Sequence, residues 1–284
     1  MNIGFTLDEK VFSEITPLAL IAKTKNLGVS SIEISPDENI LSLKKYDMIA
    51  KHCSELNMDV NFHVPYFAHD YLYEINNFIE LKKSIIQKYE SFISIVEKIQ
   101  NITCSKPVIA IHGANYKKPE FKKGGIYNTL SFLDWLLNFI EKKNISIRLA
   151  IETLKREEER TIGDNRNDIY IILNEFQSPK LGICWDMCHD FTNYYPGKIP
   201  HDDEFYQNII YSHIHGVNLE QSISHIPVKD SDLDFLEQLN FLLNKDYDGV
   251  LNLELLLSYC GKSYLDDLFE DIEFIKTVLK NQQN

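Results

Sequence analysis

Residues 147–187 read IRLAIETLKREEERTIGDNRNDIYIILNEFQSPKLGICWDM. Two short apolar runs in this stretch, Ile147–Thr153 and Leu181–Met187, have the length and the β-branched content of buried strands. Between them, Asp168–Phe176 has the apolar spacing of an amphipathic helix. A strand, a helix and a second strand in this order are typical of a parallel sheet whose helices lie outside.

The same alternation continues in both directions along the chain. Further strands are expected at Ile3–Thr6, Ser31–Ser35, Val60–Pro65, Pro107–Gly113, Ile209–Val217 and Val250–Leu255. Further helices are expected at Ile15–Leu27, Leu41–Leu56, Ile75–Ile99, Leu130–Lys143, Asp232–Leu243 and Tyr264–Lys280. Between the sixth and seventh strands we expect only a weak helix, near Asp203–Gln207. Because no glycine-rich dinucleotide turn follows the first strand, the eight units predict an α/β fold of one closed (β/α)8 TIM barrel.

Length and composition agree with this fold. The chain has 284 residues, and an α/β barrel usually has about 250. Apolar residues make up 44% of the chain and charged residues 25%, as in globular proteins. No Pro-, Gly- or Ser-rich linker divides the chain, so we expect residues 1–284 to form a single barrel domain.

Three further features bear on location and partners. The first residues lack the basic and apolar regions of a signal peptide, and no apolar run reaches the roughly 18 residues of a membrane span. The odd number of cysteines argues against a disulfide framework, so we expect reduced residues at Cys53, Cys104, Cys184, Cys188 and Cys260. We therefore expect a cytoplasmic protein with no membrane partner. The net charge of −13 disfavours nucleic acid as a partner without excluding a local basic groove, and a homo-oligomer stays open.

Ionisable residues stand near the same end of seven of the eight predicted strands. They are Glu33, His63, His112, Glu152, Asp186, the pair His213 and His215, and Glu254. In a barrel these ends converge on the mouth, where buried carboxylates repel one another unless something positive neutralises them. Because no Lys or Arg lies at these strand ends, a divalent cation is the expected counter-charge. Carboxylate and imidazole ligands suit Zn, Mn, Co or Fe better than Ca, and Mg stays open.

Neighbouring positions suggest more specific roles. His213 and His215 are two residues apart, so both point to one face of a strand. We interpret His215, closer to the strand end, as the ligand and His213 as structural. Tyr66 and Trp185 flank the proposed ligands and are either packing residues or an apolar wall for a ring substrate.

These residues resemble the xylose isomerase-like TIM-barrel superfamily over essentially the whole chain. This superfamily contains sugar and sugar-phosphate isomerases and epimerases, and also the endonuclease IV family of DNA repair. In the sugar branch, a Glu, an Asp, a His and a Glu on the last four strands bind one divalent metal. The resemblance implies metal ligands at Glu152, Asp186, His215 and Glu254. Asp186-Met187-Cys188-His189 is similar to the family's Asp-x-x-His, whose His contacts substrate or metal, and Ser31–Ser35 resembles the strand-two signature of the sugar branch.

Other segments resemble endonuclease IV. His63-Val64-Pro65-Tyr66 is similar to its His-x-Pro-Tyr segment, His112-Gly113 to its His-Pro-Gly without the proline, and His225-Ile226-Pro227 to its last His segment. The chain departs from that family at Ile223, where an Asp would bind a third metal. The alternative reading is thus a metal-dependent phosphodiester hydrolase acting on DNA, with His63, His112 and His225 as additional metal or substrate ligands.

The favoured prediction is a metal-dependent isomerase or epimerase. Its partner would be a small molecule: a sugar, a sugar phosphate or a related keto-polyol that reacts through an enediolate. By the same resemblance, Glu152 and Glu254 face opposite sides of the reacting carbon and transfer the proton, and His189 binds a substrate oxygen. The family's usual Arg after the strand-seven His is absent, because Val217-Asn218 follow His215-Gly216.

Overall fold

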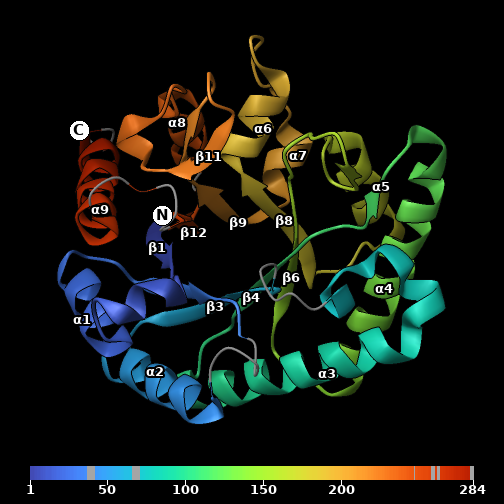
Figure 1. The fold of residues 1–284 in the computed structure, drawn as a ribbon, viewed down its shortest axis with the longest axis horizontal. Helices are drawn as coiled ribbons and strands as arrows, with labels where there is room; N and C mark the ends of the chain where they lie inside the picture. Colours follow the sequence, from blue (N-terminus) through green and yellow to red (C-terminus); the bar gives the residue numbers. More distant parts are fainter. Residues whose placement is uncertain (37–41, 66–70, 246, 257–259, 261–262, 282–284) are drawn as a thin grey trace.

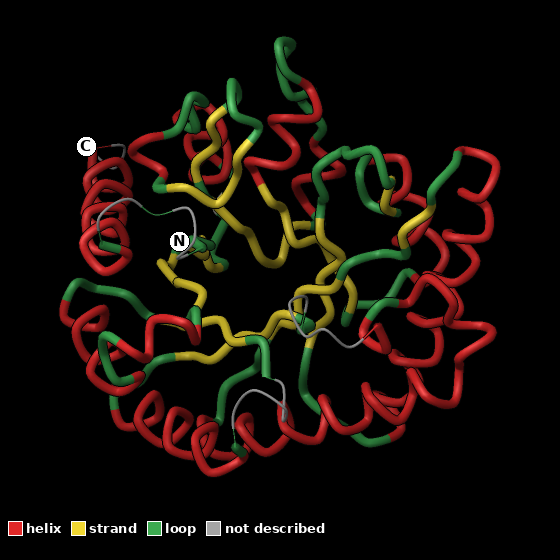
Figure 2. The backbone as a smooth tube through the Cα atoms, in the orientation of Figure 1, coloured by secondary structure: helices red, strands yellow, loops and turns green. Residues whose placement is uncertain are grey.

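The computed structural model describes residues 1–36, 42–65, 71–245, 247–256, 260 and 263–281. Eight parallel strands close into a barrel in the order β1-β12-β9-β8-β6-β4-β3-β2. Their bounds are β1 Asn2–Thr6, β2 Ser31–Ile34, β3 Asp59–His63, β4 Val108–Ile111, β6 Arg148–Glu152, β8 Leu181–Asp186, β9 Ile209–Ile214 and β12 Val250–Leu253. Figure 2 shows these strands as an inner ring with the helices outside, so the predicted (β/α)8 barrel is confirmed.

The helices follow the strands along the chain (Figure 1). The α-helices are α1 Pro17–Asn26, α2 Leu43–Glu55, α3 Phe78–Thr103, α4 Lys122–Lys142, α5 Arg166–Phe176, α6 Met187–Tyr194, α7 Asp203–Gln207, α8 Leu236–Asn244 and α9 Tyr264–Asn281. Short 3-10 helices are η1 Glu9–Ser13, η2 Tyr71–Tyr73, η3 Ile75–Asn77, η4 Pro119–Phe121 and η5 Val228–Asp230. Among the described residues, none of the helices combines the length and apolar character that crossing a membrane requires.

Two small antiparallel pairs of strands form within the loops that follow the barrel strands. β5 (Asn115–Tyr116) pairs with β7 (Arg160–Thr161), and β10 (Gly216–Asn218) pairs with β11 (Ile223–Ile226). Gly113 allows the first pair to form, because a Cβ there would lie 2.1 Å from the carbonyl oxygen of Ile162. The loops after β4 and β6 are therefore held together beside the strand ends.

The largest departure from the predicted elements is α6. The sequence indicated only a weak helix near Asp203–Gln207 in this gap, whereas a further helix starts directly after β8. Its N-cap is Asp186, whose Oδ1 accepts a hydrogen bond from the backbone N–H of His189 at 2.7 Å. The helix has only eight residues, too few for an apolar period to stand out in the sequence. The helix α4 also begins at Lys122 and not at the predicted Leu130. Gly124 and Gly125 have low helix propensity, so the sequence of its first turns did not indicate a helix.

Apolar residues fill both sides of the strands. Between strands and helices, Phe78, Tyr89 and Phe132 pack with ring centroids 4.6 and 5.5 Å apart around Phe132. Inside the barrel, a smaller cluster consists of Val108, Ala110, Ala150, Cys184 and Tyr211. This layer of apolar side chains fills the barrel interior beneath the polar residues of the strand ends.

One buried acid in the outer layer gives a prediction on stability. Asp271 of α9 accepts hydrogen bonds from the backbone N–H groups of Val228 and Lys229, at 2.6 and 3.1 Å. Burial raises the pKa of Asp271 to about 6, although these two donors and the Lys229 charge act in the opposite direction. The folded state therefore holds this proton more tightly than the unfolded state, in which an Asp has a pKa of about 3.9.

Stability contributed by protonated Asp271 should be fully present below about pH 4 and lost as the pH rises through about 6. We expect the difference in the free energy of unfolding, wild type minus Asp271→Asn, to fall by about 2 kcal/mol between about pH 4 and pH 7. Urea denaturation of both proteins across this range measures the difference, and all other titrating groups cancel. Parallel curves for the two proteins would refute the prediction.

Candidate metal centre

The polar residues of the strand ends meet at the mouth of the barrel. Glu33 on β2, His63 on β3, Glu152 on β6, Asp186 on β8 and His213 on β9 are all buried. Glu254 directly follows β12, and its side chain is 13% exposed. The carboxylates therefore lie close together with little water to screen them.

Four of these residues form a group with converging donor atoms. One ligand atom from each of Glu152, Asp186, His213 and Glu254 lies within 4.8 Å of the others. Among the described residues, none forms a hydrogen bond of good geometry with the buried Oε2 of Glu254, although Nδ1 of His213 lies 3.2 Å from it. Three carboxylates, one imidazole and an unsatisfied buried oxygen fit a divalent cation well.

The pKa shifts in this group keep the acids ionised. Burial alone would raise the pKa of Glu152, but the charges of His213 and His112 and their hydrogen bonds hold it well below the usual value. Burial would also raise the pKa of Asp186, but the charges of His189 and His215 lower it. At Glu254, His213 and His225 likewise lower the pKa in spite of burial. The acids thus have the form that a metal ligand needs.

Two histidines lie on the other side of Glu152. The Nε2 atoms of His63 and His112 are each 3.1 Å from Oε2 of Glu152. Their rings are 4.9 Å apart at the centroids, in an edge-to-face arrangement. His63, His112 and Glu152 therefore form a second group that could hold a metal ion.

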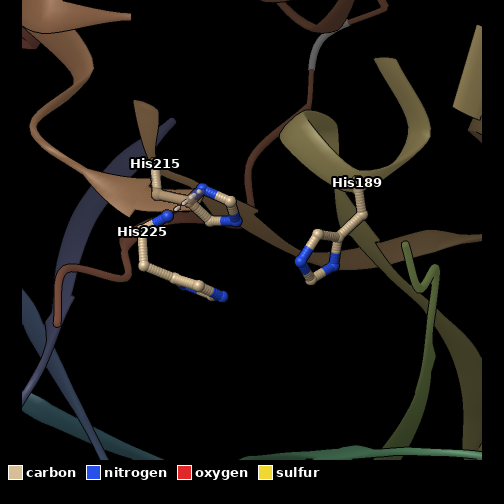
Figure 3. A group of neighbouring side chains, drawn as sticks. All are labelled: His189, His215 and His225. Carbon is tan, nitrogen blue, oxygen red and sulfur yellow. Dashed lines mark hydrogen bonds between the residues drawn. The ribbon is translucent and has the colours of Figure 1, made fainter. Parts of the chain in front are cut away.

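A third group consists only of imidazoles. Figure 3 shows His189, from the start of α6, facing His215 and His225. The rings of His215 and His225 stack at 3.9 Å, and ligand atoms of all three histidines lie within 4.8 Å of one another. Nε2 of His215 is also 3.1 Å from Oδ2 of Asp186, so this group adjoins the carboxylates.

Backbone carbonyls orient two of these three rings, and Nδ1 of the third, His215, accepts a hydrogen bond from the backbone N–H of His225 at 3.0 Å. The Nδ1 atom of His189 faces the carbonyl oxygen of Thr153 at 3.3 Å, and that of His225 faces the carbonyl oxygen of Glu254 at 3.1 Å. A ring that donates from Nδ1 to a carbonyl has its lone pair on Nε2, the usual arrangement in metal-binding histidines. His225 also has a φ of 62°, a left-handed backbone conformation that is uncommon for a residue with a side chain.

The predicted ligands lie in two adjoining groups at the barrel mouth. The structure brings Glu152, Asp186 and Glu254 together, with His215 beside Asp186. His213, which the sequence suggested to be structural, is the imidazole that lies between the carboxylates, at 3.3 Å from Glu152 and 3.2 Å from Glu254. The ligand set itself stays a prediction.

The two proposed substrate-wall residues differ in what the structure says of them. Trp185 is completely buried, and its Nε1–H donates to Oδ2 of Asp190 at 3.0 Å. Its ring packs on Phe205 and Tyr206, outside the barrel, since successive strand residues point to opposite faces. This is the packing alternative that the sequence left open. Tyr66 lies outside the described residues.

A buried ion pair behind the site had no signal in the sequence. Arg166, in the first turn of α5, donates from Nη2 to Oδ2 of Asp190 at 2.7 Å, and its guanidinium lies 4.0 Å above the ring of Phe205. Asp190 is the residue after His189, so the pair ties α6 to α5. A charged residue on an amphipathic helix is normally exposed, and the positions of both α6 and α7 explain the burial of Arg166.

Comparisons with known proteins agree with this architecture. A family model described as xylose isomerase-like TIM barrel matches residues 21–278. The uncharacterized protein MJ1188 of Methanocaldococcus jannaschii is 24% identical over 273 residues, which cover 90% of this chain and 92% of that protein. These two matches extend over nearly the whole barrel.

Similar solved structures include a D-tagatose 3-epimerase-like protein, with a TM-score of 0.74 and 18% identity over 100% of this chain and 98% of that one. An AP endonuclease, family 2, from Brucella melitensis has a TM-score of 0.68 and 11% identity, covering 94% of this chain and 97% of that one. The IOLI protein with a binding zinc atom has a TM-score of 0.66 and 16% identity, covering 99% and 98%. Identities this low establish a shared fold alone. Because the family model matches almost from end to end, the chain belongs to the xylose isomerase-like TIM-barrel family.

Proposed function

We propose that this protein is a divalent-metal-dependent isomerase or epimerase of a sugar, a sugar phosphate or a related keto-polyol. The observation that carries the proposal is the meeting of two glutamates, the buried Glu152 and the partly buried Glu254, at one point of the barrel mouth. They come from opposite sides of the pair β8 and β9, yet both lie within 3.3 Å of Nδ1 of His213. Two carboxylates that flank one position suit the removal of a proton and its return.

The proposed ligands are the three carboxylates Glu152, Asp186 and Glu254, with His215, whose Nε2 lies 3.1 Å from Asp186. His213 is close to the same carboxylates, but both of its ring nitrogens face carboxylate oxygens, so we do not count it as a ligand. Their carboxylates and imidazole suit Mn, Zn, Co or Mg, and the bound zinc of the similar IOLI structure supports a metal here. A cation in this position would supply Lewis-acid stabilisation of the negative charge on the substrate oxygens, worth several kcal/mol. The site thus accounts for so many buried acids in one place.

The protein side chains would carry the proton transfer. One glutamate removes the proton from the carbon next to the carbonyl, and the C–H electron pair becomes the double bond of the enediolate. If the other glutamate returns a proton to the opposite face of that carbon, the product is an epimer. If a proton returns to the adjacent carbon, the product is an isomer. His189 at the edge of the group would accept a hydrogen bond at Nε2 from a substrate hydroxyl, because its Nδ1 faces the carbonyl oxygen of Thr153.

A second candidate is a phosphodiester hydrolase of the endonuclease IV type. The observation that favours it is the presence of three adjoining donor groups, which could hold more than one cation. Glu152 is shared by the first two groups, and Asp186 contacts His215 of the third. Several cations would activate water and offset phosphate charge. Against it stand Ile223 on β11, which offers no ligand beside His225, and the net charge of −13.

Metal content and reaction assays separate the two candidates. For the isomerase or epimerase we expect one equivalent of metal by elemental analysis of protein purified without chelator. With a panel of ketoses in heavy water, we expect NMR to detect deuterium entering at the carbon next to the carbonyl. A duplex with an abasic site should stay intact. Two or three equivalents of metal, with metal-dependent nicking and no exchange, would favour the hydrolase instead.

A further inference from the structure

Glu33 is a buried acid that the proposed reaction does not use. It lies near the carboxyl end of β2 with 0% of its surface exposed. One carboxylate oxygen, Oε1, accepts a hydrogen bond from the Thr6 hydroxyl at 2.9 Å and faces the side-chain amide of Asn252 at 3.4 Å. The other, Oε2, lies 2.9 Å from Nε2 of His213. Burying a charged carboxylate is costly, so its orientation is set by these partners.

The ring of His213 connects Glu33 to the two catalytic glutamates. Its Nε2 faces Glu33, and its Nδ1 lies 3.3 Å from Oε1 of Glu152 and 3.2 Å from Oε2 of Glu254. Both ring nitrogens therefore face carboxylate oxygens, and only N–H groups can do so favourably. His213 is itself fully buried, so water does not substitute for these contacts.

We propose that Glu33 and His213 form a positioning pair that sets the orientation of Glu152 and Glu254 in the proposed metal site. Glu33 fixes the ring plane of His213 by accepting from its Nε2–H, and the N–H at Nδ1 hydrogen-bonds Glu152 and attracts the nearby Oε2 of Glu254 electrostatically. Metal ligands and proton-transfer groups work best when their orientation is fixed before the substrate binds. Substitution of the residues that hydrogen-bond such ligands commonly lowers metal affinity. The proposal rests on the proposed function, because it assumes that Glu152 and Glu254 bind metal.

The test is the affinity of the protein for Co²⁺, measured by titration with visible absorption. Glu33→Met removes the acceptor of the His213 N–H at nearly constant volume, and we expect it to weaken Co²⁺ binding by about 10- to 100-fold. Glu33→Gln keeps an acceptor oxygen without the charge, and we expect an affinity between those of Glu33→Met and the wild type. Glu33 lies outside the proposed ligand set, so a purely structural role would leave the affinity of folded protein unchanged.

Ser31→Ala is the matched control. Ser31 is on the same strand and face as Glu33, is also fully buried, and has no hydrogen-bond partner for its hydroxyl among the described residues. Its Co²⁺ affinity should equal that of the wild type. Wild-type affinity in folded Glu33→Met overturns the positioning pair and leaves the proposed function standing. If Glu33→Met does not fold, wild-type affinity in Glu33→Gln overturns it. A wild type that binds no Co²⁺ overturns both proposals.

Discussion

Asp186→Asn is expected to abolish metal binding and catalytic activity together. Asp186 belongs to the four-donor group and also adjoins the three histidines, with Oδ2 at 3.1 Å from Nε2 of His215. The substitution replaces an ionised oxygen by an amide that binds metal poorly. Loss of several kcal/mol of Lewis-acid stabilisation corresponds to a rate lower by about 10³-fold or more. Elemental analysis and the solvent-exchange assay measure the two effects in one preparation.

The fold of the Asp186→Asn variant should survive, because Asn is as good an N-cap as Asp. Asp186 caps α6 through the N–H of His189, and Asp202 caps α7 in the same way through the N–H of Phe205. Asp202→Asn is therefore the matched control, an Asp-to-Asn change at an N-cap away from the donor groups, and it should keep its metal. Full metal occupancy and normal turnover in Asp186→Asn would disprove its assignment as a ligand.

The largest expected effect on stability is that of Arg166→Met. Arg166 is 5% exposed and forms a 2.7 Å ion pair with Asp190, which is itself buried and also accepts the Trp185 N–H. Removing the cation leaves Asp190 as an unpaired charge in the protein interior. We expect the free energy of unfolding to fall by about 3–5 kcal/mol. Urea denaturation followed by circular dichroism measures it.

The exposed pair Lys276 and Glu273, at 2.8 Å on α9, is the control for this change. Lys276→Met removes a charge of the same sign from a helix but leaves its partner in water, so we expect a loss of about 0–1 kcal/mol. A loss below about 1 kcal/mol for Arg166→Met as well would show that Asp190 finds another partner or becomes protonated.

The sequence predicted the barrel well because its signals are local. Each of the eight strands is a short apolar run, and most helices have an apolar period, so the alternation can be read without knowing any contact. The short helix α6 was not predicted, because it directly follows a site residue, Asp186, and buries His189 and Asp190 where an ordinary helix would have apolar residues. The role of Arg166 was not predicted either, because its partner Asp190 lies 24 residues away in the sequence and only the fold brings the two together.

By itself the sequence determined the fold class and the set of ionisable residues at the strand ends. Only the tertiary structure decided which imidazole meets which carboxylate. His213 and His215 point to the same side of β9, and their heights in the mouth depend on the register between strands, which aligns His213 with Asp186 on one side and Asn252 on the other. That register follows from the closure and tilt of the whole barrel, a property of eight strands together that no single segment of the chain contains.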